Sequence, residues 1–464
     1  MSSPLSAEIF REYDIRGIVG TELDAQTARR IAVAYAVKLA RSGARPGDKP
    51  VALGRDCRLS SESLFAAFSA GLRESGYSVI DLGVCPTPVV YFALYHLDVA
   101  GGVQITGSHN PAEYNGFKLS CGRTTIWGEE IQELYRIVKD GETTGAHAPG
   151  SIEPYAIVAA YQDYVRQNTP LEGKGMKIVV DGGNGTGGAV GAPLFESMGF
   201  HVEGLFCEMD GRFPNHHPDP TVAKNLEALI ARVRETQAAI GIAYDGDADR
   251  LGAVDENGKI FWGDQLLIVF ARDILSRNPG AAIVGEVKCS ELLYKDIEAR
   301  GGRAIMWKTG HSILKAKLKE EDALLAGEMS GHLFFKERYF GYDDAIYASV
   351  RLVDILKRSQ GKASQLLADL PETFTTPEIR VDCADSLKFK VADKARERFA
   401  RDHRVIAIDG VRVLFEPDGW GLIRASNTQP VLVLRFEAST PERLAEIRGR
   451  VEAELGRIRA ELGA

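Results

Sequence analysis

The sequence has few cysteines and no long apolar segment. It contains 6 cysteines in 464 residues, and none form a C-x-x-C pair, so neither a cysteine zinc site nor a disulfide framework is indicated. This usage is typical of a reducing compartment, and we expect a cytoplasmic protein. The longest uncharged apolar stretch, residues 82–97, contains two prolines and is shorter than the roughly 20 residues of a membrane-spanning helix. The charged residues near the N-terminus do not resemble a signal peptide.

The sequence also lacks an excess of positive charge. Lys and Arg number 56, Asp and Glu number 64, and the formal net charge is −8. Neither a nucleic acid nor a membrane surface is therefore expected as the main partner. The hydrophobic content of 45% and the length are typical of a globular protein with roughly two to four domains. An anionic ligand would have to be bound by individual cationic side chains.

Strands and helices alternate over most of the chain. Three apolar strands, beginning at Val51, Ile178 and Ile283, each lead into a small or polar turn and then a helix. Each is followed later by a second strand that ends in a polar cluster. We predict three similar α/β units with mixed, largely parallel sheets. The clusters should lie at the carboxyl ends of strands, where they could share one central cleft.

The last part of the chain has a different pattern. Short strands are predicted at 379–381, 412–415, 421–424 and 431–436, with helices at 386–401 and 441–462. This pattern predicts a smaller C-terminal α+β domain. The predicted domains are residues 1–152, 153–257, 258–370 and 371–464.

The turn Thr106-Gly107-Ser108-His109-Asn110-Pro111 follows a predicted strand end. Ser108 could hydrogen-bond within its own loop, or it could be a nucleophile with His109 beside it as a proton-transfer group. The serine-hydrolase motif Gly-x-Ser-x-Gly is excluded, because Asn110 occupies its last position.

Three carboxylates alternate in Asp245-Gly246-Asp247-Ala248-Asp249-Arg250. They could form a solvated acidic turn, or they could surround one hard cation. A calcium EF-hand is excluded because its sixth position requires glycine and here is Arg250, and because the flanking segments are predicted strands. Mg²⁺ completed by phosphate oxygens fits better. Lys118, His109 and Arg250 are candidates to balance the charge of such a phosphate.

Two further loops carry polar groups. Glu328, Ser330 and His332 could hydrogen-bond the vicinal hydroxyls of a sugar, although Glu328 could instead cap a helix. Lys288 and His311 follow nearby strand ends, and His311 could also be a structural histidine.

The stretch Arg424-Ala425-Ser426-Asn427-Thr428-Gln429-Pro430 joins two predicted strands. Its arginine, hydroxyls and backbone amides could form a phosphate cradle, and the alternative is a polar hairpin loop. The glycine-rich loop 181–185 lacks the nucleotide-binding motifs and is interpreted as a structural turn.

Taken together and in this order, the four loops resemble the α-D-phosphohexomutase family, most closely its bacterial phosphomannomutase/phosphoglucomutase branch. The opening Tyr13-Asp14-Ile15-Arg16-Gly17 matches as well. Met329 favours the mannose/glucose branch, because phosphoglucosamine mutases usually carry Gln there. Ala248 departs from the usual glycine of the metal loop, which matters only if this residue needs a positive φ.

The resemblance implies four domains and a mutase that interconverts the 1- and 6-phosphates of mannose and glucose. It implies a phosphoserine at Ser108, a bound hexose 1,6-bisphosphate intermediate, glucose 1,6-bisphosphate as activator, and a monomer. Mg²⁺ would be held by the Ser108 phosphate and by Asp245, Asp247 and Asp249. A phosphoglucosamine mutase and a non-catalytic sugar-phosphate-binding protein remain alternatives.

The resemblance also assigns roles to individual residues. The implied catalytic residues are Ser108, His109, Lys118, Arg250 and His311. The implied substrate-binding residues are Tyr13, Arg16, Lys288, His311, Glu328, Met329, Ser330, Gly331, His332, Arg424, Ala425, Ser426, Asn427 and Thr428.

Overall fold

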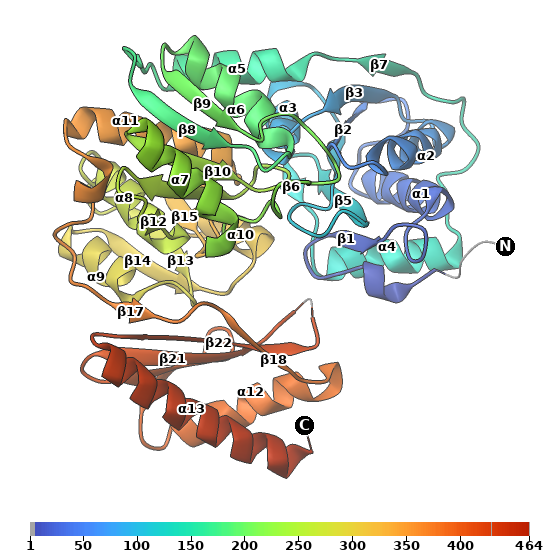
Figure 1. Cartoon of the computed structure of the whole chain (residues 1–464). Helices are drawn as coiled ribbons and strands as arrows, with labels where there is room; N and C mark the ends of the chain where they lie inside the picture. Colours follow the sequence, from blue (N-terminus) through green and yellow to red (C-terminus); the bar gives the residue numbers. More distant parts are fainter. Residues whose placement is uncertain (1–4, 428, 464) are drawn as a thin grey trace.

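A computed structural model describes residues 5–427 and 429–463. Four sheets follow one another along the chain, with helices packed against them (Figure 1). Three sheets are mixed and the fourth is antiparallel, which confirms the predicted fold class. Within the described ranges, no helix is both long enough and apolar enough to cross a membrane.

The first unit contains a seven-stranded sheet. Its strands are, in spatial order, β1 (Ile15–Ile18), β5 (Tyr114–Cys121), β4 (Gly101–Ile105), β2 (Val51–Arg55), β3 (Val79–Val84) and β7 (Ile152–Pro154), with β6 (Thr124–Thr125) paired to β5. Its helices are η1 (Ala7–Ile9), α1 (Ala25–Arg41), α2 (Ser61–Glu74), α3 (Thr87–His96) and α4 (Glu129–Asp140).

Helix α4 illustrates why these segments are helical. Its buried residues Ile131, Leu134, Ile137 and Val138 recur at helical spacing and form one apolar face. Gly141 ends the helix with a φ of 69°, a left-handed conformation that glycine adopts without steric cost.

The second unit contains a five-stranded sheet. Its strands are, in spatial order, β12 (Ile260–Phe261), β11 (Leu251–Asp255), β10 (Ile240–Tyr244), β8 (Lys177–Asp181) and β9 (His201–Leu205). Its helices are α5 (Ile157–Asn168), α6 (Thr186–Ser197), η2 (Ala223–Leu226) and α7 (Glu227–Thr236).

The third unit contains a four-stranded sheet. Its strands are, in spatial order, β14 (Arg303–Trp307), β13 (Ala282–Glu286), β15 (Leu325–Gly327) and β16 (Leu333–Phe335). Its helices are α8 (Gly263–Leu275), α9 (Glu291–Ala299), α10 (His311–Glu320), α11 (Ala345–Ser359) and η3 (Ala363–Gln365).

The three units share one sheet topology. Three parallel strands lie side by side, in the order β3-β2-β4, β9-β8-β10 and β14-β13-β15. In each unit the last of the three then pairs with an antiparallel strand, which is β5, β11 or β16. The loop into that antiparallel strand therefore leaves the same edge of each sheet.

The fourth unit is the predicted C-terminal α+β domain. Its strands are β17 (Phe374–Thr375), β18 (Ile379–Asp382), β19 (Arg404–Ile406), β20 (Val411–Phe415), β21 (Gly419–Ala425) and β22 (Val431–Ala438), and its helices are α12 (Asp385–Phe399) and α13 (Pro441–Leu462). The two helices cover one face of the antiparallel sheet, and the other face is turned toward the third unit (Figure 1).

The hydrophobic cores divide the molecule unevenly. One large core runs from α3 of the first unit through the second and third units. The fourth unit has a core of its own, formed by its sheet together with α12 and α13. A small cluster of Val287, Trp420 and Leu422 connects it to the third unit. The domain limits at residues 152, 257 and 370 stay predictions.

Candidate active site

The four predicted loops occupy corresponding places in the fold. Ser108 lies between β4 and β5, the three aspartates lie between β10 and β11, and Glu328–His332 lies between β15 and β16. Arg424 lies at the end of β21, where the chain turns into β22. Side-chain contacts between these loops, described below, bring residues from all four units together.

Ser108 directly contacts the aspartate loop. Its hydroxyl donates a hydrogen bond of 2.9 Å to Asp245 Oδ2 and lies 3.2 Å from Nδ1 of His109. Its φ of 49° is uncommon for a residue with a side chain. Such backbone strain persists where the surrounding structure holds it in place and is often found at functional sites.

The three aspartates form a compact, fully buried carboxylate cluster. Their ligand oxygens lie within 4.8 Å of one another. In the described part of the chain, Asp247 Oδ1 and Asp249 Oδ1 are buried without a hydrogen-bond partner. Burial, followed by the charges of Asp249 and Asp247, raises the pKa of Asp245 well above its ordinary value. Buried oxygens that lack partners and repel one another fit a divalent cation such as Mg²⁺.

Lys118, on β5, partly compensates this negative charge. Its ammonium donates a hydrogen bond of 2.7 Å to Asp247 Oδ2 and a second one to Asp249 Oδ2. Burial alone would lower the pKa of Lys118, but the two carboxylates outweigh it and hold the pKa well above its ordinary value. The lysine is therefore a fixed positive charge beside the carboxylate cluster.

The two predicted histidines are partly buried, and both are neutral at neutral pH. Burial and the charge of Arg250 hold the pKa of His109 well below its ordinary value. Burial and the charge of Lys315 do the same to the pKa of His311, which begins α10. A neutral imidazole can accept a proton at neutral pH, and His109 is within reach of the Ser108 hydroxyl.

Ala248 adopts a left-handed backbone conformation, which glycine would adopt without strain. Its φ is 59°, so this position does require the left-handed region. For alanine this conformation costs about 1–2 kcal/mol. The carboxylates on either side, Asp247 and Asp249, nevertheless remain in the cluster.

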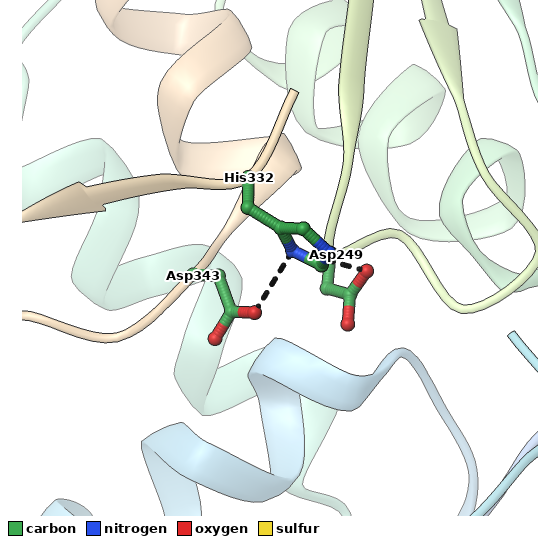
Figure 2. A group of neighbouring side chains, drawn as sticks. All are labelled: Asp249, His332 and Asp343. Atoms are coloured by element: carbon green, nitrogen blue, oxygen red, sulfur yellow. Dashed lines mark ion pairs between the residues drawn. The ribbon is translucent and has the colours of Figure 1, made fainter. Parts of the chain in front are cut away.

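Asp249, His332 and Asp343 form a second buried group (Figure 2). Nε2 of His332 accepts a hydrogen bond of 3.0 Å from Nε of Arg250, which leaves the imidazole proton on Nδ1. Nδ1 lies 3.0 Å from Asp343 Oδ2 and 3.6 Å from Asp249 Oδ1. Asp343 thus orients His332, and His332 in turn orients the Arg250 guanidinium.

Sequence analysis missed Asp343, and its neighbour explains why. In Asp343-Asp344, directly before α11, an aspartate has the usual role of a helix cap. Asp344 does fill that role, because its side chain accepts a hydrogen bond of 2.8 Å from the Tyr347 amide. Only the fold turns Asp343 toward His332.

The predicted sugar loop is held by hydrogen bonds on both sides. Glu328 Oε1 accepts a 2.9 Å hydrogen bond from the Gly310 amide, and Glu328 Oε2 accepts one of 2.8 Å from the Ser330 hydroxyl. The Met329 amide donates at 3.0 Å to Glu286, which ends β13. Sequence analysis did not name Glu286 as a site residue, although it marked that strand end.

The sugar loop also packs directly against the second unit. Arg250 and His332 form a β-bridge between the metal and sugar loops. A Cβ on Gly331 would lie 2.5 Å from the Leu251 carbonyl oxygen, so this approach requires glycine.

Tyr13 links three units. Its hydroxyl donates a hydrogen bond of 3.0 Å to the Thr309 carbonyl and lies 3.1 Å from the Asn427 amide, which donates to it. Its ring contacts His311 edge-on, with centroids 5.6 Å apart. Arg16 lies three residues later, on β1, and donates a hydrogen bond of 2.8 Å to the Asn110 side chain, so it supports the Ser108 loop.

The predicted phosphate loop presents Arg424 toward the same region. Nε of Arg424 donates a hydrogen bond of 3.0 Å to Asp409, a residue that sequence analysis missed. Ser426 accepts a hydrogen bond of 3.2 Å from the Gln429 amide, and Ala425 pairs with Leu432 across the hairpin. Thr428 lies outside the described residues.

Lys288 connects the third and fourth units at this side. Its ammonium is 3.1 Å from Glu378 and 3.6 Å from Glu286, and the side chain is buried. Burial alone would lower the pKa of Lys288, but Glu286 and Glu378 outweigh it and raise the pKa, so the lysine stays positively charged. It lies close enough to Glu328 and Arg424 for both to affect its pKa.

Four family models match the chain in succession. They are phosphoglucomutase/phosphomannomutase alpha/beta/alpha domain I at residues 7–144, domain II at 159–258, domain III at 262–374 and the C-terminal domain at 378–454.

Relatives and solved structures match over nearly the whole length. A phosphomannomutase/phosphoglucomutase of Pseudomonas putida is 47% identical over 459 residues, which are 99% of this chain and 97% of the relative. A phosphoglucomutase of Neisseria gonorrhoeae is 46% identical over 97% of both chains. A crystal structure of a family protein from Burkholderia thailandensis has a TM-score of 0.91 and 42% identity, covering 98% of both chains. The chain therefore belongs to the phosphoglucomutase/phosphomannomutase family.

Proposed function

We propose that this chain reversibly interconverts the 1-phosphates and 6-phosphates of glucose and mannose. The observation that carries the proposal is the contact between the Ser108 hydroxyl and Asp245, at 2.9 Å, within a buried cluster of three carboxylates. A hydroxyl beside a buried cation site is suited to carry a phosphoryl group. The names of the relatives supply the substrate class.

Each half of the reaction exchanges one phosphorus–oxygen bond for another. The phosphorus of phosphoserine 108 bonds to the free hydroxyl oxygen of the bound hexose phosphate, and its bond to the serine oxygen breaks. The hydroxyl proton moves to a base, and a hexose 1,6-bisphosphate results. The bisphosphate turns end for end, its other phosphoryl group returns to Ser108, and the released sugar oxygen takes up a proton.

The residues around Ser108 stabilise the transferring group. The transition state of phosphoryl transfer is loose, so positioning and charge neutralisation provide most of the catalysis. Lys118 supplies a fixed positive charge, and Arg250, oriented by His332, supplies a second one. Mg²⁺, held by Asp245, Asp247, Asp249 and the serine phosphate, would neutralise charge on the phosphoryl oxygens.

Proton transfer is assigned to a neutral imidazole. His109 lies 3.2 Å from the Ser108 oxygen and can exchange its proton. His311 lies between Tyr13 and His332, on the side where the sugar hydroxyl would approach. Lys118 remains an alternative base, because a cation bound to Asp247 and Asp249 would take over the carboxylates that now pair with its ammonium.

The remaining loops bind the sugar and the phosphate that does not react. Glu328, Met329, Ser330 and Gly331 hold the ring hydroxyls, and His332, whose ring nitrogens face Arg250 and Asp343, orients Arg250 for transfer. Arg424, Ala425, Ser426 and Asn427, with Thr428, hold the distal phosphate, and Lys288 adds positive charge to that region. Tyr13 and Arg16 close the cleft from the first unit.

The wider setting is also part of the proposal. Glucose 1,6-bisphosphate should act as activator, because it phosphorylates Ser108 in an enzyme that has lost its phosphate. We also infer a monomer in the cytoplasm. The six cysteines, none of which forms a disulfide, support the location.

A coupled mutase assay tests the function. The protein is supplied with Mg²⁺ and a trace of glucose 1,6-bisphosphate, and mannose 1-phosphate, glucose 1-phosphate and glucosamine 1-phosphate are compared. Similar kcat/KM for the first two and little for the third is the expected result. Preference for the amino sugar would move the chain to the phosphoglucosamine branch. No turnover on any of them, with Ser108 phosphorylated, would leave a sugar-phosphate-binding protein.

A further inference from the structure

Arg58 is a buried arginine to which no role has yet been assigned. It lies in the loop between β2 and α2, and its side chain is 0% exposed. Its Nε is 3.1 Å from Asp56, which forms its ion pair. Burying a charged side chain is costly unless all its polar groups are satisfied. The remaining partners of Arg58 therefore show what its guanidinium does here.

The guanidinium donates to four backbone carbonyls of the serine loop. Nη2 donates to Ser108 O at 2.8 Å and to Asn110 O at 2.6 Å. Nη1 donates to Pro111 O at 2.5 Å and to Tyr114 O at 3.0 Å. An arginine fork can hold several acceptors in fixed directions, which the single ammonium of a lysine cannot do. One side chain thus fixes the course of the chain from Ser108 to Tyr114.

Asp56 holds the same loop from its amide side. Its Oδ2 accepts hydrogen bonds from the Thr106 hydroxyl at 2.8 Å and from the Gly107 amide at 3.2 Å. The Thr106 hydroxyl in turn accepts one of 2.8 Å from the Ser108 amide. A Cβ on Gly107 would lie 2.5 Å from Cζ of Arg58, so glycine is needed for the guanidinium to fit beneath the loop. These contacts hold Ser108 at its positive φ.

The carbonyl that Arg58 holds also contacts the metal loop. A Cβ on Gly246 would lie only 2.3 Å from Ser108 O, so the two loops are in close contact at this atom. The ring of Phe213, from the second unit, lies 5.0 Å from Cζ of Arg58. Arg58 therefore lies between the two units and sets the position of the serine relative to the carboxylates.

We propose that Arg58, paired with Asp56, is a positioning residue that holds Ser108 in register with the three aspartates for phosphoryl transfer. The inference rests on the proposed mutase function, because register matters only if Ser108 carries the phosphoryl group. Among the described residues, the side-chain partners of Arg58 are Asp56, the serine loop and Phe213, so its loss should slow transfer without weakening substrate binding. Misplacing reacting groups by about 1 Å can cost about 100-fold in rate.

Arg58→Lys and Arg58→Met separate charge from geometry. Both variants are first phosphorylated with glucose 1,6-bisphosphate and checked by intact mass. We expect kcat with glucose 1-phosphate to fall about 100-fold in both, with KM changed less than about threefold. The lysine variant keeps the charge and loses the fork, so a wild-type kcat for it would overturn the proposal. An equal loss of kcat/KM that came from a raised KM, with kcat unchanged, would overturn the proposal as well.

Arg351→Lys is the matched control for destabilisation. Arg351 is also 0% exposed and pairs with Glu337 at 2.8 Å, but it lies on α11, away from the serine. Its substitution should lower the thermal midpoint and leave kcat unchanged at 25 °C. If Arg351→Lys lost as much kcat as Arg58→Lys, general destabilisation would explain the loss and the proposal would fail.

Amide hydrogen exchange provides a readout that does not depend on the reaction. In Arg58→Lys, exchange should accelerate in peptides covering 106–116, with the α11 peptides unchanged, and the reverse should hold for Arg351→Lys. Unchanged exchange at 106–116 would show that Arg58 does not hold the loop. A different result would separate the two proposals. If the wild type had no mutase activity but exchange at 106–116 still accelerated in Arg58→Lys, the proposed function would be refuted, while the conclusion that Arg58 holds the serine loop would stand.

Discussion

The serine and metal loops are built differently from the phosphate loop. The former belong to units that are joined by one continuous core, which takes in α3 of the first unit and runs through the second and third, although most of the first unit packs around a core of its own. The phosphate loop belongs to a unit with a separate core. That unit meets the third through the small cluster of Val287, Trp420 and Leu422 and through polar contacts, such as Arg412 Nη1 donating at 2.7 Å to each of the Val287 and Cys289 carbonyls.

The two designs suit two tasks. Phosphoryl transfer needs groups held in fixed geometry, which a shared core provides. Gripping a phosphate that arrives in two orientations, and releasing product, is easier for a unit that can move as a whole. Tyr13, hydrogen-bonded to Thr309 and Asn427, joins the two regions when they are together. Substitutions in the first region should therefore change kcat, and those in the second should change KM.

The largest expected effect follows from Ser108→Ala. Loss of the nucleophile should reduce kcat by at least about 1,000-fold, because no other group can carry the phosphoryl. The coupled assay measures this directly. Ser349→Ala, a buried serine on α11, is the control and should keep its turnover. Activity of Ser108→Ala near that of the control would remove Ser108 from the mechanism.

Arg424→Ala should weaken substrate binding by the phosphate loop of the fourth unit. A charge-assisted hydrogen bond contributes about 1.5–3 kcal/mol, so KM for glucose 1-phosphate should rise about 10- to 100-fold, with a smaller change in kcat. Initial rates over a range of substrate concentration separate the two. Arg396→Ala, an exposed arginine on α12 of the same unit, should leave KM unchanged. An unchanged KM in Arg424→Ala would refute the phosphate cradle.

Asp343→Asn tests the contact between the sugar loop and the metal loop. The substitution weakens the carboxylate contact, at 3.0 Å, that orients His332 and through it Arg250. We expect kcat to fall about 10-fold, with little change in KM, because Arg250 acts on the transferring group. If KM alone rose, His332 would belong to sugar binding rather than to transfer.

Asp344→Asn is the smallest change and should affect stability only. Burial raises the pKa of Asp344 from 3.8 to about 6, despite hydrogen bonds from Tyr347, Tyr339 and Tyr161. Because the folded-state pKa is the higher one, its stabilising contribution is full below pH 3.8 and is lost as the pH rises through about 6. The difference corresponds to about 3 kcal/mol.

The thermal midpoint measures that contribution. Between pH 4 and pH 7 the wild type should lose stability relative to Asp344→Asn, because asparagine does not ionise. The thermal midpoint of Asp344→Asn minus that of the wild type should therefore increase by several degrees from pH 4 to pH 7. The kcat of the variant should stay near that of the wild type. A difference independent of pH would show that Asp344 does not titrate in this window.

Much of the fold could be predicted from local patterns. The repeated strand, polar turn and helix predicted the three units, and the antiparallel pairing that follows each parallel trio explains why the predicted clusters fall in equivalent loops. The roles of the predicted site residues remain proposals. Their spatial grouping, however, could be anticipated, because the carboxyl ends of strands meet at one edge of a sheet.

The sequence by itself determined which chemical groups each loop carries: a serine, three alternating carboxylates, a Glu-Met-Ser-Gly-His segment and an arginine. It determined this because a loop's composition is local. Only the tertiary structure decided how these groups meet. Ser108 and Asp245 are 137 residues apart, and Arg250 and His332 are 82 apart. Asp343, Glu286 and Arg58 acquire their contacts from tertiary packing between segments far apart in the sequence, and Ala248 has a positive φ that no local pattern specifies.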